Sequence, residues 1–281
     1  MISTDNYSER VDFLRRTIDE ADHIIIGAGS GLSTAAGIDY SGEDFRQEFA
    51  PWIKRYGFTD LYTSSFHPFE TQEEYWAYWA KHIWFSRYRT GATELYKMLF
   101  SKFGIQNSTF VVTTNVDGQF EMAGFSVERI FATQGDYHWF QPASGTPKTL
   151  IDNRNWVMNV LPLIEDCRIP TEMIPTMPDG SPAAMNLRVD ETFVEDFRWH
   201  QQARRYTDFV QQASQGNLLL LEFGIGYNTP GIIRLPFEQM AQRFPHTTLV
   251  RFNRDNPEPY IENLPRFAAF TEDIATIIRQ L

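Results

Sequence analysis

The feature that most constrains the fold of this chain is a short apolar run that leads directly into a glycine-rich turn. Residues 24–26 are all isoleucine, and Gly27, Gly29 and Gly31 follow within five positions. Consecutive β-branched residues are typical of a strand that is buried on both faces of a parallel sheet. Glycines let the backbone turn tightly and approach a ligand. The next residues, 32–37, are expected to form the first turns of a helix.

A strand, a glycine turn and a helix start together point helix N–H groups at a pyrophosphate, so this stretch predicts a dinucleotide site. The spacing departs from G-x-G-x-x-G, because Leu32 stands where the third glycine would be. The acidic residue that reads a ribose about 20 residues later is also missing in clear form, since residues 45–53 hold only Glu48. A hydride-transferring dehydrogenase is therefore a poor fit, and a strand-to-helix turn without a ligand is the plain alternative.

The composition excludes several classes of protein. The 281 residues suffice for one large domain with an inserted module, and the apolar runs are too short to cross a bilayer. The net charge of −11 argues against binding to nucleic acid. The single cysteine, Cys167, excludes an internal disulfide and a cysteine-based zinc site. Without a secretory signal at the start of the chain, we expect a cytoplasmic protein with no membrane partner.

Helical and strand patterns alternate along most of the chain, which predicts a doubly wound α/β fold with a parallel sheet. Buried strands are expected at residues 24–26, 108–114, 127–133, 217–223 and 248–252. Helices are expected at residues 8–21, 71–89, 92–103, 119–124, 191–214 and 237–244, and an apolar stripe at 270–281 closes the fold. Residues 137–186 are rich in proline, glycine and asparagine, and we expect an irregular module there.

Polar or small residues follow the predicted strands. Asn115 and Asp117 follow the second strand, Gln134 the third, and Asn253 the last. In an open α/β sheet this carboxyl edge is where ligands bind. Asparagine and aspartate also suit a strand-to-helix turn and cap without any ligand, and that alternative stays open.

Taken together, these motifs resemble the sirtuin family. The matching positions are Gly27-Ala28-Gly29, Ser33, Gly37-Ile38, Asp44-Phe45-Arg46, Thr114-Asn115-Val116-Asp117, Ala123-Gly124, Gln134-Gly135, Gly224-Ile225-Gly226 and Asn253. The resemblance implies a Rossmann-like NAD-binding domain at residues 1–38, 92–136 and 200–281. It also implies a small module built from two insertions, at 39–91 and 137–199.

The chain is most similar to the macrodomain-linked branch, class M, of the bacterial sirtuin-like ADP-ribosyltransferases. Positions shared with that branch are Gly31-Leu32-Ser33, Glu74-Tyr75-Trp76-Ala77, Ile169-Pro170, Glu172-Met173-Ile174-Pro175, Gly224-Ile225-Gly226-Tyr227 and Thr229-Pro230. Compared with deacylating sirtuins, Gln134 replaces the general-base histidine and Thr114 the usual glutamine. The zinc-ribbon cysteines are also absent, so no metal is expected.

The resemblance implies NAD as co-substrate and assigns its contacts. Ala28, Gly29 and Ser33 would face the pyrophosphate, Tyr40 and Phe45 would cover the nicotinamide ribose, and Asn115 and Asp117 would orient the ribose and carboxamide. Gly224, Gly226, Asn253 and Asp273 would surround the adenosine half. The expected set of NAD-binding residues also includes Gly27, Leu32, Ile225, Tyr227 and Gln134.

Cleavage of the nicotinamide–ribose bond expels a neutral group and leaves a sugar cation, so catalysis rests on orientation and electrostatic support. We expect Asn115, Asp117 and Gln134 to be the catalytic residues. The Gln134 amide can hydrogen-bond ribose hydroxyls, but it cannot take a proton near pH 7. Transfer to an ionised carboxylate needs no base, whereas deacylation does. His138 is the alternative base, although a loop role is the simpler interpretation.

The sequence therefore predicts a cytoplasmic NAD-dependent protein mono-ADP-ribosyltransferase. The resemblance implies a lipoylated glycine-cleavage H-like carrier as the acceptor protein, with a partner macrodomain hydrolase that removes the modification. Alternatives are an NAD-dependent deacylase, a sensor that binds NAD or ADP-ribose without turnover, and a free NAD glycohydrolase.

Overall fold

A computed structural model describes residues 6–38, 40–105, 108–226 and 230–281. The chain divides into two compact units, each made of separate segments. The large unit comprises Met1–Ala36, Ala92–Gln134 and Phe197–Leu281, and the small unit comprises Gly37–Gly91 and Gly135–Asp196. Each unit is described below by itself.

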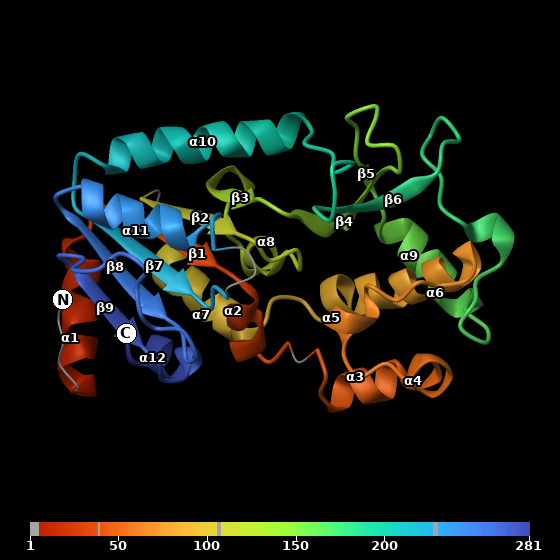
Figure 1. Cartoon of the computed structure of the whole chain (residues 1–281), viewed down its shortest axis with the longest axis horizontal. Coiled ribbons are helices and arrows are strands. Elements are labelled where there is room, and N and C mark those ends of the chain that lie inside the picture. The colour runs from red at the N-terminus through yellow and green to blue at the C-terminus, as the bar shows by residue number, and fades with distance from the viewer. Residues whose placement is uncertain (1–5, 39, 106–107, 227–229) are drawn as a thin grey trace. The chain divides into compact units, whose positions relative to one another are not determined.

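The described residues of the large unit form a six-stranded parallel sheet with the order β3-β2-β1-β7-β8-β9 (Figure 1). Its strands are β1 (His23–Ala28), β2 (Thr109–Thr113), β3 (Ile130–Ala132), β7 (Leu218–Phe223), β8 (Thr247–Phe252) and β9 (Phe267–Phe270). The chain builds outward from β1 in one direction through β2 and β3, and in the other through β7, β8 and β9. The carboxyl ends of β1 and β7 therefore flank the topological switch point, where open α/β sheets bind ligands.

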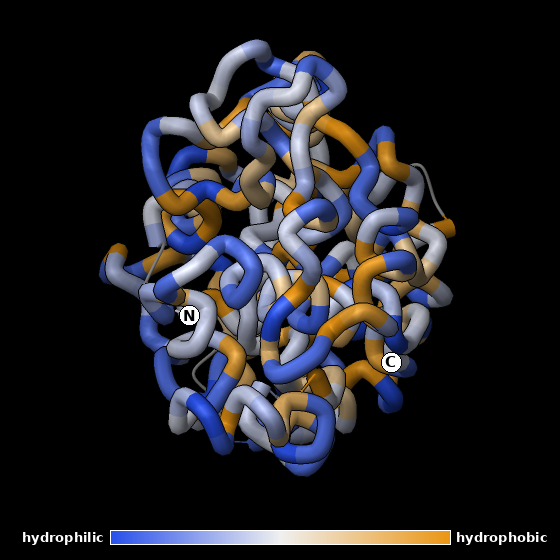
Figure 2. Tube along the Cα trace, turned by 90° about the vertical axis from the view of Figure 1, so that its right-hand side faces the viewer, coloured by the Kyte–Doolittle hydropathy of each residue, from blue (hydrophilic) through white to orange (hydrophobic). Residues whose placement is uncertain are grey.

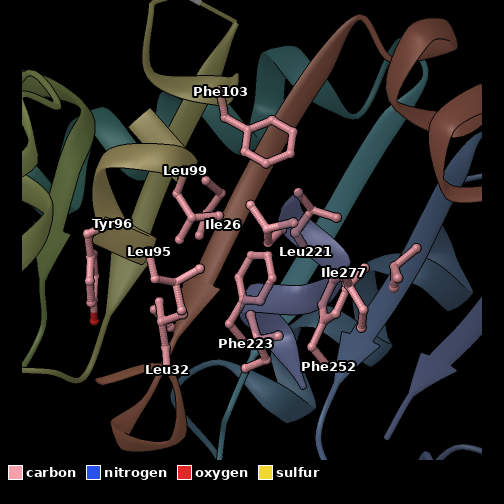
Figure 3. Packing of buried hydrophobic residues seen from close by; sticks show 14 of the residues in the cluster. Ile26, Leu32, Leu95, Tyr96, Leu99, Phe103, Leu221, Phe223, Phe252 and Ile277 are labelled. Carbon is pink, nitrogen blue, oxygen red and sulfur yellow. The ribbon is translucent and has the colours of Figure 1, made fainter. Parts of the chain in front are cut away.

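Helices cover both faces of this sheet, which confirms the doubly wound fold predicted from the sequence. One face carries α1 (Tyr7–Glu20), α2 (Ser30–Ala35), α7 (Glu94–Leu99), α8 (Gln119–Ala123) and α12 (Ile274–Gln280), and the other carries α10 (Phe197–Ala213) and α11 (Arg234–Arg243). Ile24 and Ile26 of β1 lie in the core of the first face, and Ile25 lies in the core of the second. Figure 3 shows how side chains from β1, α7, β7, β8 and α12 fill the first core.

Two of the expected elements in the large unit are shorter than predicted. The predicted strand 127–133 begins instead as a 3₁₀ turn, Val127–Arg129, in which the Ser126 side chain accepts from the Glu128 amide. The predicted helix 191–214 begins only at Phe197. Upstream of Phe197, the Val194 amide donates to Gln141 Oε1 (2.9 Å) and its carbonyl accepts from Asn186 (3.1 Å), so both backbone groups of Val194 are paired outside a helix.

A fully buried ion cluster stabilises the β7–β8 side of the large unit. The Arg251 guanidinium binds both oxygens of Glu222 (2.8 and 2.9 Å) and Oε1 of Glu238 (2.7 Å), and all three side chains are 0% exposed. Burial raises the pKa of Glu222 despite this pairing. Arg251 and Arg234 also donate to the carbonyl of Glu258. The cluster therefore fixes the loop that follows β8 at the carboxyl edge of the sheet.

The small unit has an ordered antiparallel sheet, β5-β4-β6, so the expectation of an irregular module at 137–186 is wrong. Its strands are β4 (Gly135–Pro142), β5 (Ile151–Asp152) and β6 (Ala183–Leu187). Its helices are α3 (Glu43–Glu48), α4 (Ala50–Tyr56), α5 (Leu61–Ser64), α6 (Gln72–Ile83) and α9 (Arg154–Val160), with a π-helical turn at Trp84–Tyr88. β5 has only two residues, and β6 follows it after a long segment that contains α9, which is why periodicity did not reveal this sheet.

Aromatic rings and an ion cluster hold the small unit together. Trp76 of α6 packs edge-on against Phe140 of β4 (centroids 5.2 Å apart) and against Trp156 of α9 (5.6 Å). His82 is hydrogen-bonded between the hydroxyls of Tyr78 and Tyr137, and burial lowers its pKa to about 3. Buried Glu74 binds Arg55 and Arg168, both at 2.8 Å. These contacts span α4, α6, α9, β4 and the loop before Ile169.

Hydrophobic residues occur along the traced chain in short stretches (Figure 2). Among the residues that the structure describes, no helix is long and apolar enough to cross a membrane.

Candidate active site

Two glycine turns meet at the switch point of the large unit. The Gly29 amide donates to the Phe223 carbonyl and the Gly31 amide to the Gly224 carbonyl, both at 3.0 Å. A Cβ on Gly31 would lie 2.7 Å from Gly224 Cα, and a Cβ on Gly224 would lie 2.5 Å from Gly31 Cα. Gly224 also has a φ of +60°, a conformation that side chains rarely adopt. Each turn therefore requires glycine because of the other turn.

The backbone amides of the first glycine turn are hydrogen-bonded within the protein, which the sequence did not predict. The Gly29 and Gly31 amides bind the β7 turn, and the Leu32 amide donates to the Gly29 carbonyl (3.0 Å). These three N–H groups are therefore paired within the protein and not left open toward a pyrophosphate. The helix that starts here, α2, is also only six residues long.

Several residues expected to bind NAD serve the core instead. A Cβ on Gly27 would lie 2.5 Å from Ile233 and 2.7 Å from Phe237, so glycine makes room here for α11. Ala28 and Leu32 are both 0% exposed and belong to the core on the opposite face. A role for these three positions is therefore limited to their backbone.

Beneath the glycine turn lies a polar cluster formed by Ser33, Tyr96, Asn115 and Asp117. Ser33 Oγ donates to Asp117 Oδ2 (2.6 Å) and lies 2.9 Å from the Tyr96 hydroxyl. Asp117 Oδ1 accepts from the Gln119 amide at the start of α8 (3.1 Å). Ser33 and Tyr96 are 0% exposed and Asp117 is 2% exposed. The cluster thus joins α2, α7 and the turn after β2.

Burial keeps the Tyr96 phenol protonated. Its pKa is raised well above the usual value, first by burial and then by the negative charge of Asp117. The Tyr96 hydroxyl can therefore both donate and accept a hydrogen bond within the cluster.

The half-buried Asn115 side chain has a defined orientation. Its Nδ2 donates to the Gly29 carbonyl (2.9 Å), and it lies 3.1 Å from Ser33 Oγ and 3.2 Å from the Tyr96 hydroxyl. A carbonyl only accepts, so the nitrogen of the Asn115 amide must face Gly29. The Oδ1 oxygen makes no hydrogen bond to any residue in the described ranges, and it is the end of the amide left for a ligand.

The Ser33 hydroxyl and Asp117 differ from their expected positions. The hydroxyl of Ser33 points to Asp117 and not to open space, and Asp117 is buried with both carboxylate oxygens engaged. A direct contact from Asp117 to a carboxamide stays a prediction. Asn115 is the one member of this cluster that is only half-buried, so its amide is the group that a ligand can reach.

Gln134 follows β3 at the same carboxyl edge. Its side chain is half-buried and makes no hydrogen bond to a residue that the structure describes. The preceding residue, Thr133, is bound to β2 through the Thr113 carbonyl, which accepts from both its amide and its hydroxyl at 3.0 Å. Thr114 is likewise bound to β1, because its amide donates to the Ala28 carbonyl (3.0 Å). Hydrogen bonds therefore fix the backbone of the residues next to Asn115 and Gln134 at this edge, and the Gln134 side chain stays half-buried.

On the other side of the switch point, Asn253 holds the β7 turn. Its Nδ2 donates to the Ile225 carbonyl (2.8 Å), and its Oδ1 accepts from the Asn256 amide (2.9 Å). Ile225 is buried and Gly226 is exposed. Asp273 is exposed and caps α12 through the Thr276 amide (2.8 Å). Tyr227 lies outside the described residues.

The small unit holds the other expected residues. Phe45 is 1% exposed and stacks on Phe49, so its ring is a core group and not a free cover for a ribose. Tyr40 is half-buried against the same core. Arg46 is exposed and pairs with Glu43 (3.1 Å). His138 lies between the Tyr88 hydroxyl (3.0 Å) and Asp152 (3.1 Å), which is the environment of a structural histidine.

Sequence reasoning missed Tyr96. The sequence predicts a helix at residues 92–103, where Leu95, Met98 and Leu99 suit an inward side and an aromatic among them reads as one more core residue. Only the tertiary structure shows that the phenol oxygen reaches Ser33 and Asn115. A tyrosine in place of phenylalanine at a fully buried position was the available signal, because a buried hydroxyl needs a partner.

Comparison with solved structures identifies the fold of this chain. The chain matches Sir2Tm bound to a propionylated peptide with a TM-score of 0.58 and 15% identity, over 96% of each chain. It matches a structure on sirtuin substrate affinity at a TM-score of 0.60 and 18% identity, again over 96% of each. A complex of Sir2 with a p53 peptide and NAD⁺ matches at 0.55 and 16%, over 96% of this chain and 95% of that one. The fold is that of the sirtuins.

Sequence relatives narrow this class. The chain is 32% identical to a protein ADP-ribosyltransferase of Staphylococcus aureus over 277 residues, which is 98% of this chain and 87% of that protein. It is 27% identical to a probable bifunctional ADP-ribose hydrolase/ADP-ribosyltransferase of Fusarium oxysporum over 249 residues, which is 82% of this chain and 40% of that protein. No protein-family model matches the chain. The chain belongs to the family of sirtuin-like protein ADP-ribosyltransferases.

Proposed function

We propose that this protein transfers ADP-ribose from NAD to an acceptor protein and releases nicotinamide. The observation that carries the proposal is the Asn115 amide, whose nitrogen is hydrogen-bonded within the cluster and whose carbonyl oxygen has no partner among the described residues. The name of the Staphylococcus relative supports the same reaction. The bond that breaks joins the nicotinamide nitrogen to the ribose, and the new bond joins that ribose carbon to the acceptor.

The residues at the switch point fit NAD. The turns at Gly29–Gly31 and Gly224 approach each other more closely than any side chain allows, which brings backbone up to the edge where a dinucleotide binds. The Asn115 oxygen is a hydrogen-bond acceptor that can bind a ribose hydroxyl or an attacking group. Asn115 and Gln134 present uncharged polar atoms at this edge, and Asn253 holds the neighbouring β7 turn through the Ile225 carbonyl. We propose that they contact NAD.

The electrostatics of the cluster suit a reaction that passes through a sugar cation. Asp117 accepts from Ser33, and Ser33 accepts from the Asn115 amide nitrogen, so the buried negative charge polarises the amide toward its oxygen. A carbonyl dipole fixed in this direction stabilises positive charge that develops in front of it. We propose that Asp117 acts on the reaction through Ser33 and Asn115.

Gln134 favours group transfer over acyl removal. Removal of an acyl group by the sirtuin reaction requires a base beside the ribose, and an amide cannot serve as one. An acceptor carboxylate is already ionised at neutral pH, so it attacks the sugar without a base. We therefore propose a carboxylate side chain as the acceptor group and expect little deacylation.

For the acceptor protein, we propose a lipoylated glycine-cleavage H-like carrier, on the basis of the family resemblance. We also propose a macrodomain hydrolase as the partner that reverses the modification. The Fusarium relative supports this pairing, because its name joins an ADP-ribose hydrolase to the transferase within one protein. We propose the cytoplasm as the compartment.

Asn115→Ala tests the proposed site. We expect nicotinamide release from NAD in the presence of the carrier to fall by about 100-fold or more, because the oriented oxygen is lost. Asn217→Ala is the control, since Asn217 is an exposed asparagine that precedes β7 at the opposite edge of the sheet. Equal activity of Asn115→Ala and the wild type would contradict the site. NAD binding by calorimetry without any nicotinamide release would instead indicate a sensor, and release without label on a protein would indicate a glycohydrolase.

A further inference from the structure

The hydroxyl of Tyr96 is a polar group on an otherwise apolar helix face. Leu95, Tyr96 and Leu99 of α7 are buried in the core of the large unit, and the Tyr96 ring meets Phe120 edge-on with centroids 4.9 Å apart. Figure 3 shows Tyr96 at the margin of this core, with its ring apart from the leucines that surround Ile26. A phenylalanine would fill the same space. The oxygen must therefore be explained by what it binds.

The hydrogens of the cluster can be assigned from its geometry. Ser33 gives its only hydrogen to Asp117, because a carboxylate accepts and the distance is 2.6 Å. Ser33 Oγ must then accept from the Tyr96 hydroxyl (2.9 Å). One hydrogen of Asn115 Nδ2 goes to the Gly29 carbonyl, and the other lies between Ser33 Oγ and the Tyr96 oxygen. Tyr96 is thus a donor to Ser33 and an acceptor for Asn115.

We propose that Tyr96 is a positioning residue of the transfer reaction, whose hydroxyl holds Ser33 and the Asn115 amide in the orientation that presents the Asn115 carbonyl oxygen to the ligand. This inference rests on the proposed function. The Gly29 carbonyl fixes which end of the amide points inward, but a single hydrogen bond lets the amide plane turn. The second hydrogen bond, to Ser33 and Tyr96, stops this rotation. Tyr96 acts through Asn115 and does not contact the substrate.

Tyr96→Phe removes one oxygen atom and keeps the ring. If Tyr96 positions Asn115, kcat for nicotinamide release should fall by roughly 10- to 100-fold, because small misplacements of a catalytic group have effects of this size. The KM for NAD should stay within about threefold of the wild type, because Tyr96 does not contact NAD and the misplaced Asn115 oxygen weakens support of the transition state. If the hydroxyl has only a structural role, kcat should not change and the melting temperature alone should move.

Tyr206→Phe is the matched control. Tyr206 lies in α10 of the same unit, where its ring packs against Phe110 and Phe131 on the other face of the sheet. This variant also removes one phenol oxygen from the large unit, and we expect its kcat to equal that of the wild type. A loss of kcat in both variants would overturn the proposal, because it would reflect general loosening of the fold.

A double-mutant cycle with Asn115→Ala separates the positioning role from the proposed function itself. If Tyr96 acts through Asn115, Tyr96→Phe should cause no further loss of kcat in the Asn115→Ala background. Independent, multiplicative losses would overturn the positioning role and leave the proposed function intact. If Asn115→Ala alone retains wild-type kcat, the proposed function fails, and this inference fails with it. Should Tyr96→Phe not fold, Ser33→Ala removes the same arm of the cluster, and an unchanged kcat there would overturn the inference.

Discussion

At the scale of single residues, the site depends on groups that are fixed by partners from distant parts of the sequence. Asn115 is oriented by Gly29, Ser33 and Tyr96, which lie 86, 82 and 19 positions away along the chain. The sequence indicated Asn115, Asp117 and Gln134, because each follows a buried run that reads as a strand. It could not indicate that Ser33 would turn toward Asp117. That choice depends on tertiary neighbours that no local pattern encodes.

At this scale, we predict that a side chain at Gly224 destabilises the fold. Gly224→Ala should lower the free energy of unfolding by about 1–3 kcal/mol through the positive φ alone, with the clash against Gly31 added. Because the two turns form the proposed NAD site, the increase in melting temperature on NAD addition should be lost as well. Urea unfolding and thermal melts with and without NAD measure both effects. Gly91→Ala is the control, since a Cβ there meets nothing within 4 Å; equal stability of both variants would contradict the account.

At the scale of elements, most of the buried parallel strands were predictable, whereas β9 and the strands of the small unit were not. Strands such as β1, β2 and β7 are apolar on both faces and stand out as short runs of isoleucine, valine or leucine. Most ends of these strands lie within one residue of the predicted ends, whereas residues 191–196 lie outside the observed helix because Gln141 and Asn186 hydrogen-bond to the Val194 backbone. The strands β4 and β6 carry few β-branched residues and are separated by 40 residues, so local pattern gave no signal for them.

The ion cluster of Glu74 predicts a pH dependence for the small unit. Burial alone would raise the pKa of Glu74, but the hydrogen bond and charge of Arg168 and the charge of Arg55 lower it below 4.5 overall. The stability that the ionised Glu74 contributes is therefore present above pH 4.5 and is lost as the pH falls through the lowered pKa. Glu74→Gln should lower the melting temperature at pH 7 by about 2–5 °C and flatten its decline below pH 4.5. Glu70→Gln, an exposed position, serves as the control, and an acid profile of Glu74→Gln that matches the wild type would count against this role.

We also predict that metal chelators leave the stability of the small unit unchanged. The residues that the structure describes contain no group of three or more His, Cys, Asp or Glu side chains placed to hold a metal ion. The unit is instead packed by rings such as Trp76, Phe140 and Trp156. We expect the melting temperature in excess EDTA to equal that in buffer, as measured by circular dichroism. A fall in melting temperature that added zinc reverses would show that the unit needs a metal after all.

At the scale of the whole molecule, a fold can persist while its reaction changes. The chain keeps the sirtuin architecture over 96% of its length with identities of only 15–18% to the solved structures compared. Its 32% identity to the Staphylococcus transferase is the stronger guide to chemistry. The fold was predictable because the glycine turns and the polar residues after the strands occur in the same order along this chain as in the sirtuin family. We propose that the reaction depends on one substitution, the amide of Gln134 at the position where the resemblance places the imidazole of deacylating members.

One mass-spectrometric measurement tests this claim most directly. The wild-type protein and Gln134→His are each incubated with NAD, a lipoylated carrier protein and an acetyl-lysine peptide, and the masses of carrier and peptide are recorded together. We predict that the wild type adds one ADP-ribose to the carrier and leaves the peptide acetylated. A wild-type reaction that deacetylates the peptide and leaves the carrier unmodified would contradict the account.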